Sequence, residues 1–335
     1  MPYPKRYVDG VLLNWGDRLF YEPVYPIKAP RTSRVAWRGT PAQLRAQIAR
    51  TIRRVPEVMI KITNKPGGKK GMTAIRDHLR YISRNGQVEL EDQDGQAILG
   101  VHELRDVVDE WRHSGMGIPD ESRHREAFNV MLSMPPGTDR QAMRDAARAF
   151  AKTEFGESHH YVFAAHEDEA HPHVHLCVQA RGRQGRRLNP RKADLQCWRE
   201  RFAEHLREHG VEANATPRRT RGVTQRYAKQ AVVHLRERGE SPANSPPASS
   251  ATFDAHRRVL DAWREIARAL AASDNGADRR MSIDVTDFVR QMPVVQAGLA
   301  SNPEFAKEPS LAPESRESRR HSTSQLGQEE PDIEH

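Results

Sequence analysis

Short apolar or alternating stretches, bounded by proline, glycine or asparagine, are typical of β-strands and recur through the middle of the chain. The predicted strands are 57–63, 127–134, 160–166 and 173–181, and residues 87–91 could begin another. Elsewhere apolar residues recur every three or four positions, as in amphipathic helices. The predicted helices are 41–54, 72–84, about 139–155 and 192–209, with little regular periodicity before residue 41. This mixed order, with one tight strand-turn-strand, predicts an α+β fold: a central antiparallel sheet with flanking helices.

Two helices show their apolar stripes clearly. In the first, Met72, Ile75, Leu79 and Ile82 fall on one face, and Asn85-Gly86 ends the helix. The second, predicted over 253–273, has its stripe at Val259, Trp263, Ile266 and Leu270. Such a stripe could contact a partner protein, although it more often belongs to a core.

Composition narrows the class of protein. The chain has 335 residues and a net charge of +8, which favours a polyanionic partner such as nucleic acid. It has two cysteines, no recognisable secretory leader and no apolar stretch of the roughly 18 residues that a membrane span needs. These features predict a soluble, cytoplasmic protein without membrane insertion.

Charge and complexity also predict domain boundaries. Residues 1–56 hold eleven Lys/Arg against three acidic residues and form a basic N-terminal extension. The patterned block at 57–216 follows, and then a helical region at 217–300 that includes a Ser/Pro-rich linker at 237–252. Residues 301–335 are rich in Ser, Pro and Glu and are predicted to be a disordered tail.

Six of the sixteen histidines fall within residues 159–175, around the sequence HEDEAHPHVH. In a strand, His173 and His175 project to the same face, and His166 arrives beside them if the two strands pair. Three converging imidazoles predict a catalytic divalent-metal site, and Asp168 could hold an imidazole in the right tautomer. The alternative is a solvated hairpin whose histidines bind nothing.

Basic residues follow the second histidine strand. Lysines and arginines without an intervening acid are predicted to contact a nucleic-acid backbone. They are Arg181, Arg183, Arg186, Arg187, Arg191 and Lys192. A second basic segment lies at 218–229. A metal beside phosphodiesters would act as a Lewis acid.

Three collinear segments resemble a known family. H-x-D-x-x-H-P-H-V-H (166–175), SMPPGTD (133–139) and LRYISRNGQVEL (79–90) are similar to motifs of the plasmid-mobilisation relaxases. These enzymes belong to the HUH-endonuclease superfamily, and the likeness is greatest to the P-type relaxases that include the T-DNA border endonuclease. It covers roughly residues 57–216.

The resemblance implies an activity and a set of site residues. Such enzymes nick one DNA strand at an origin of transfer, and a tyrosine becomes joined to the 5′ phosphate. Tyr81 matches that tyrosine, Ser133 matches a serine near the scissile phosphate, and Asp168 matches the acidic residue. The metal-binding histidines correspond to His166, His173 and His175. One departure is Gln179, where the family motif often has asparagine.

The implied cofactor is a divalent ion, Mg²⁺ or Mn²⁺. The implied partners are origin DNA, single-stranded at the nick, accessory relaxosome proteins and the coupling protein of a type IV secretion system. The protein would act in the bacterial cytoplasm and could pass with the DNA into a recipient cell.

A physical argument also favours Tyr81 as the nucleophile among the seven tyrosines. Four precede residue 26, in a segment without a predicted scaffold, Tyr161 is expected to pack, and Tyr227 lies in a basic helix. Tyr81 lies on the last turn of a helix, beside its apolar stripe. A phenol is protonated at neutral pH and needs activation. Asp168, His171 or metal-bound water could accept its proton, and the sequence leaves that choice open.

Two other functions fit parts of the pattern. A replication initiator or transposase of the same superfamily would use the same metal and tyrosine on different DNA. A non-enzymatic DNA-binding module would keep the basic segments but would not need Tyr81 or the histidines.

Overall fold

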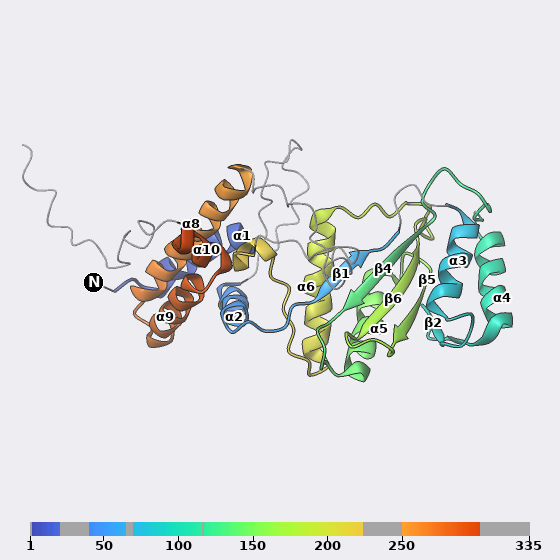
Figure 1. The fold of residues 1–335 in the computed structure, drawn as a ribbon, viewed down its shortest axis with the longest axis horizontal. Helices are drawn as coiled ribbons and strands as arrows, with labels where there is room; N and C mark the ends of the chain where they lie inside the picture. The colour runs from blue at the N-terminus through green and yellow to red at the C-terminus, as the bar shows by residue number, and fades with distance from the viewer. Residues whose placement is uncertain (1, 21–39, 65–69, 116, 224–249, 302–335) are drawn as a thin grey trace, which may run out of the picture. The chain divides into compact units, whose positions relative to one another are not determined.

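The computed structural model describes residues 2–20, 40–64, 70–115, 117–223 and 250–301 (Figure 1). These residues fall into two compact units. One runs from Gly16 to Arg221, and the other combines the chain before Gly16 with the chain from Gly222 onward. The domain boundaries expected at residues 57 and 216 stay predictions.

The first unit is built on a six-stranded antiparallel sheet in the order β1-β4-β6-β5-β2-β3. Its strands are β1 (Met59–Ile62), β2 (Leu90–Asp92), β3 (Ala97–Ile98), β4 (Ala127–Ser133), β5 (Tyr161–His166) and β6 (His173–Gln179). The long strands β4, β5 and β6 lie at its centre, and β5 and β6 are joined by the histidine-rich turn. The predicted α+β fold with a central antiparallel sheet is confirmed.

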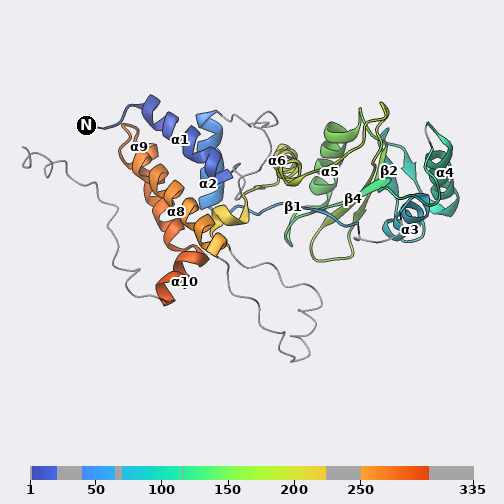
Figure 2. The same ribbon diagram turned by 90° about the horizontal axis from the view of Figure 1, so that it is seen from above.

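Helices cover both faces of this sheet. They are α3 (Met72–Ile82), α4 (Gly100–His113), α5 (Arg140–Phe155) and α6 (Lys192–Glu208). The same unit also contains α2 (Pro41–Ile52). Figures 1 and 2 show α5 and α6 on one side of the sheet and α3 and α4 on the other. The predicted helices at 41–54, 72–84, 139–155 and 192–209 are therefore present, while α4 and β3 were not anticipated.

Strand β6 separates two environments. Val174, Leu176 and Val178 face α5 and α6, where they join a fully buried core with Phe150 and Phe202. Burying side chains of this size contributes about 1.5–3 kcal/mol each. The alternate residues of β6 face the α3 side. The core on one face thus fixes the strand that carries His173 and His175 on the other.

Local signals set the helix ends that matter for the site. Asp139 caps α5, because its side chain accepts a hydrogen bond of 2.7 Å from the Ala142 amide. Helix α3 ends at Ile82, after which Arg84, Asn85 and Gly86 all have positive φ. At Gly86 a Cβ would also lie 2.7 Å from the Gly100 carbonyl carbon, so the turn needs glycine there.

The N-terminal segment differs from expectation. Lys5–Phe20 forms helix α1, where the sequence showed little periodicity. Val8, Leu12 and Leu19 are fully buried, so the helix has an apolar face after all. Tyr3 and Tyr7 thus lie at a helix, not in a segment without a scaffold, and their rings contact each other at 4.5 Å. Residues 21–39, with Tyr21 and Tyr25, lie outside the described residues.

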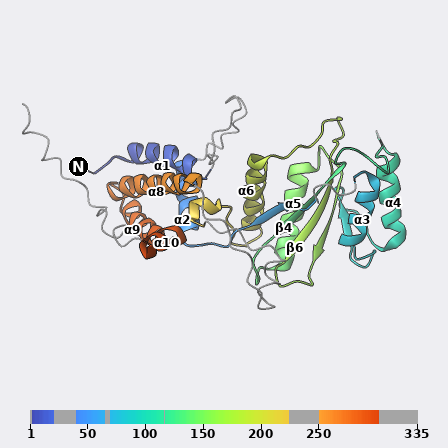
Figure 3. The same ribbon diagram turned by 45° about the horizontal axis from the view of Figure 1, so that its top comes forward.

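The second unit is helical. It contains α8 (Ser250–Ala271), α9 (Gly276–Arg290) and α10 (Pro293–Ser301). Figure 3 shows α8 and α9 beside each other. The predicted stripe of Val259, Trp263, Ile266 and Leu270 is buried, so it forms core. Trp263 meets Phe288 of α9 edge-on at 5.4 Å.

Two predicted segments lie largely outside the described residues: the linker at 237–252, except its last three residues, and the tail beyond Ser301. Within the described parts of the chain, none of the helices combines the length and apolarity that crossing a bilayer requires.

Candidate active site where strands β5 and β6 meet

Three histidines converge where β5 ends and β6 begins. His166 pairs directly with His173, and His175 pairs with Ala164 two residues further along. All three side chains are buried, and their candidate ligand nitrogens lie within 4.8 Å of one another. Because the three groups project from paired strands, the sheet itself sets their spacing. The convergence expected from the sequence is present.

Hydrogen bonds orient two of these rings. His166 Nε2 lies 2.7 Å from the Ile82 carbonyl oxygen, and His173 Nδ1 lies 3.1 Å from that of His171. A carbonyl only accepts, so each of these nitrogens carries the proton and leaves the other with a lone pair. His166 Nδ1 is buried without a hydrogen-bond partner. The donor set therefore fits a metal ion, since an unpaired buried nitrogen is what a ligand position requires.

Burial keeps His166 and His175 uncharged. Burial, followed by the neighbouring His166 and His173, lowers the pKa of His175 to about 3. The pKa of His166 is also lowered, chiefly by burial. Both imidazoles are consequently neutral at pH 7, and neutral imidazole is the form that binds metals.

Tyr81 lies next to the histidine cluster on the last turn of α3. Its ring is 5.8 Å from that of His175, at an interplanar angle of 84°. The side chain is 55 % exposed, so its hydroxyl can be reached from solvent while its ring is held against the cluster. The structure thus brings the predicted tyrosine to the predicted metal site.

Ser133 belongs to the same row. It pairs with His173 across β4 and β6, as His166 does across β5 and β6, so the three residues cross the sheet side by side. Ser133 is buried, and its hydroxyl makes only a long contact of 3.5 Å with the Met134 carbonyl. That hydroxyl therefore keeps most of its hydrogen-bonding capacity for a ligand.

Asp168 does not hydrogen-bond an imidazole, contrary to the role expected for it. Its carboxylate accepts a hydrogen bond of 2.6 Å from Arg84, and the same guanidinium lies 5.6 Å from the centre of the Tyr81 ring. The carbonyl of Ile82 orients His166 in its place. Asp168 therefore contacts Arg84, which in turn lies over the ring of Tyr81.

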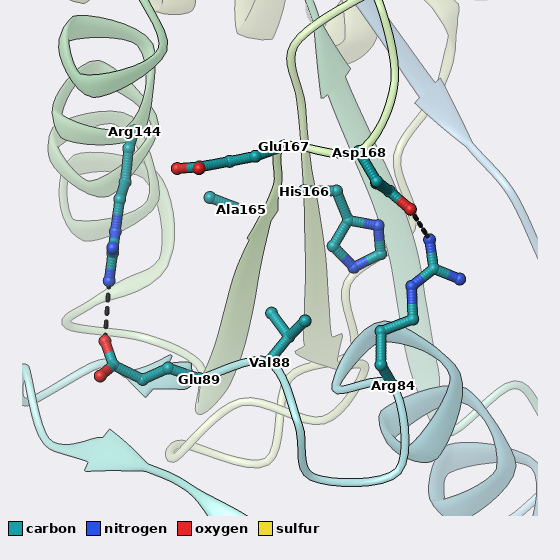
Figure 4. A pocket seen from close by; sticks show the side chains of 8 residues that line it. All are labelled: Arg84, Val88, Glu89, Arg144, Ala165, His166, Glu167 and Asp168. Atoms are coloured by element: carbon teal, nitrogen blue, oxygen red, sulfur yellow. Dashed lines mark hydrogen bonds and ion pairs between the residues drawn. The ribbon is translucent and has the colours of Figure 1, made fainter.

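An open pocket of about 420 Å³ adjoins the cluster. Figure 4 shows His166 between the Arg84–Asp168 pair on one side and a second pair, Arg144–Glu89, on the other. Arg144 lies on α5, on one face of the sheet, and Arg84 lies in the turn after α3, on the other face. The pocket thus carries both signs of charge around His166, because each arginine is paired with a carboxylate.

The predicted basic segment lies elsewhere. It follows the far end of β6, and Arg181 lies six positions after His175, about 20 Å along an extended chain. Arg187 is held by the buried Glu126 at 3.1 Å and by the Arg125 carbonyl. The structure therefore does not bring Arg181–Lys192 to the histidines. Of the second basic segment, residues 224–229 fall outside the described residues.

Two residues of the site were not predicted to act there. His78 stacks near Tyr81, with ring centres 6.3 Å apart, and its Nε2 is buried without a partner. Burial, then His166, lowers the pKa of His78 to about 4. Arg84 is the other. His78 lies three residues before Tyr81 on α3, so helical spacing was the available signal for it. Arg84 lies in the turn after α3, where that spacing does not apply.

Comparison with known proteins identifies this region. The family description "Relaxase: MobA/VirD2-like, nuclease domain" matches residues 81–211, beginning at Tyr81. This segment is a relaxase nuclease domain of the MobA/VirD2-like type. All three histidines lie within the match.

Named relatives agree with the family description. The chain is 30 % identical over 188 residues to the T-DNA border endonuclease VirD2 of Rhizobium radiobacter, covering 51 % of this chain and 44 % of that protein. It is 31 % identical over 202 residues to the VirD2 of Agrobacterium fabrum, covering 55 % and 45 %. The chain thus matches less than half the length of these relatives.

A solved structure described as "Molecular Basis of Vancomycin Resistance Transfer in Staphylococcus aureus" covers 48 % of this chain and 98 % of its own. Its sequence identity is 13 % and its TM-score 0.32, which is too low to support an argument about the fold.

Proposed function

We propose that the relaxase domain nicks one strand of DNA at an origin of transfer, with Tyr81 as the nucleophile. The resulting 5′-phosphotyrosyl link would let the protein pilot the strand during transfer of a plasmid or other mobile element. The observation that carries this proposal is the contact of the exposed Tyr81 with His175, at the mouth of a buried histidine cluster.

The reaction exchanges one phosphodiester for another. The Tyr81 oxygen forms a bond to phosphorus as the bond from phosphorus to the 3′ oxygen breaks. The phenol gives up its proton, and the departing 3′ oxygen takes one up. Because the phosphotyrosyl ester retains the energy of the broken bond, the free 3′ hydroxyl can later reverse the step. Hydrolysis would lose that energy.

His166, His173 and His175 would hold a divalent ion. When bound, it supplies Lewis-acid stabilisation of the charge that develops on the phosphoryl oxygens. Mg²⁺ and Mn²⁺ both remain proposals. Three imidazole nitrogens favour Mn²⁺, because Mg²⁺ prefers oxygen ligands.

Arg84 and Ser133 are proposed to act on the same phosphate. The guanidinium of Arg84 lies over the Tyr81 ring, where it can donate to an oxygen of the phosphate that Tyr81 attacks. Asp168 fixes its orientation from the opposite side. Ser133, in the row of His166 and His173, can donate to a phosphate oxygen.

The remaining partners are proposals of the same kind. They are accessory relaxosome proteins, a type IV coupling protein and, as the place of action, the cytoplasm with export into a recipient cell. The relatives' name, T-DNA border endonuclease, supports DNA transfer over replication or transposition.

The test is Tyr81→Phe. The ring and its contact with His175 remain, and only the nucleophilic oxygen is lost. We expect single-stranded origin DNA to bind normally and no covalent adduct to appear on a denaturing gel. Tyr161→Phe is the matched control, since Tyr161 is buried in β5, and it should retain the adduct. An adduct from Tyr81→Phe would show that another residue attacks.

A further inference from the structure

A second, shallower groove lies between α3 and α4, on the side of α3 away from the sheet site. Figure 2 shows these helices beside each other. The groove encloses about 190 Å³, and four of its lining residues are arginines: Arg76 and Arg80 on α3, and Arg105 and Arg112 on α4. Neither the metal site nor the predicted basic segment includes any of them.

Positive charge in this groove exceeds what the protein neutralises. Its only lining carboxylate among the described residues is Asp109, which pairs with Arg112 at 2.7 Å. Arg76, Arg80 and Arg105 form no ion pair with another described residue. The Nε groups of Arg76 and Arg112 are also buried without an acceptor. Buried donors of this kind normally have partners, so the groove lacks acceptor oxygens.

The groove is close to the proposed nucleophile. Arg80 immediately precedes Tyr81, so the two side chains differ by about 1.5 Å along the helix and about 100° around it. Arg76 lies one turn earlier, and Arg84 follows in the turn after the helix. Arg76 and Arg80 therefore share the face of α3 that lines the groove, directly next to Tyr81 in the sequence.

We infer that this arginine groove holds the sugar-phosphate backbone of the DNA strand on which Tyr81 acts. Phosphate oxygens supply the acceptors that the guanidinium groups lack. The groove has apolar residues on α4, Leu104 and Val108, which suit a deoxyribose. The inference rests on the proposed function, because it assigns the groove to that reaction's substrate.

The test compares two double variants of the full chain. Arg80→Gln/Arg105→Gln removes two exposed charges from the groove, and Arg183→Gln/Arg186→Gln removes two exposed charges beyond the far end of β6. Binding of a fluorescent, mixed-sequence single strand of roughly 30 nucleotides is measured by anisotropy at several salt concentrations. A strand with an uncharged methylphosphonate backbone is the second probe.

We expect the groove variant to bind about tenfold more weakly at ~0.1 M salt. The slope of the logarithm of its binding constant against the logarithm of the salt concentration should be shallower by about 1.4. The control variant should lose less affinity. Wild type and groove variant should bind the uncharged strand equally. At saturating origin DNA, the rate of adduct formation should be unchanged, since the groove binds and does not react.

Unchanged affinity and salt dependence in the groove variant would overturn the inference. An equal loss in both double variants would also overturn it, because it would indicate long-range charge and not a groove. These outcomes leave Tyr81 chemistry intact. Conversely, groove-dependent binding without any tyrosine adduct on origin DNA would contradict the proposed function and support the groove.

Discussion

Strand β6 begins at the histidine cluster and is followed at its other end by the basic segment, the two features that predicted a nucleic-acid enzyme. The two clusters differ in their burial and in their contacts. At the start, His173 and His175 are buried, and His175 contacts His166 of β5 and Tyr81 of α3. Beyond the end, Arg183 and Arg186 are exposed and form no ion pair with another described residue. Arg187 instead neutralises a buried glutamate.

The difference shows that separation along a strand decides which residues can share one site. Residues two apart share a face, so the histidine pair could be placed from sequence alone. Residues eight apart are roughly 25 Å distant, so the arginines cannot belong to the same site. The positive charge near Tyr81 comes from Arg84, whose closeness depends on the turn after α3.

The largest effect should follow from removing a histidine at the start of β6. His173→Ala deletes one of three nitrogen donors, so nicking should fall at least about 100-fold and bound metal, measured by calorimetry, should be lost. His171→Ala is the matched control, because its carbonyl still accepts from His173. Chelation should abolish nicking by the wild type, and added Mn²⁺ should restore the nicking activity. Full nicking in excess chelator would rule the metal out.

Arg84 should give the next largest effect. Arg84→Ala removes the guanidinium over Tyr81 and should slow adduct formation by about 10- to 100-fold. Arg84→Lys keeps the charge without the planar fork and should recover part of the rate. Asp168→Asn should lose only a few-fold, since it orients Arg84 without touching the substrate. Single-turnover rates at saturating DNA measure all three, and a greater loss in Asp168→Asn would make Asp168 the more direct participant.

At the other end of β6, the expected effect is on stability. Arg187→Gln leaves the buried Glu126 short of its charged partner and should lower the free energy of unfolding by about 1–2 kcal/mol. Arg186→Gln, an exposed neighbour, should stay within about 0.5 kcal/mol of the wild type. Urea unfolding followed by tryptophan fluorescence compares them. Equal stabilities would show that Arg187 is not part of the scaffold.

Most of the sheet and the histidine cluster followed from sequence because their signals are local. Alternation placed His173 and His175 on one face, the prolines after Met134 marked the end of β4, and Asp139 capped α5 as a short polar side chain should. The buried stripe of α8 was readable for the same reason.

Helix α1 was missed because its signal is tertiary. Gly10 and Gly16 lower helix propensity within it. At Gly16, a Cβ would lie 2.9 Å from a Leu44 methyl carbon, so the small residue permits close packing on α2. Only the packed neighbour explains that glycine.

The wrong contact predicted for Asp168 has a similar cause. Its partner depends on where the turn after α3 meets the β5–β6 turn, and no sequence spacing encodes that meeting. His78 lay at a readable helical position, whereas Arg84 lies in the turn after α3. Their closeness to the histidines required the sheet.

The central claim is that Tyr81 is the residue joined to DNA. The direct measurement is mass spectrometry of the protein–DNA adduct after nuclease and protease digestion, using wild-type chain and single-stranded origin DNA. The account predicts one modified peptide, carrying a 5′-linked nucleotide on Tyr81. A nucleotide on any other residue, or nicked DNA with no linked peptide at all, would contradict it.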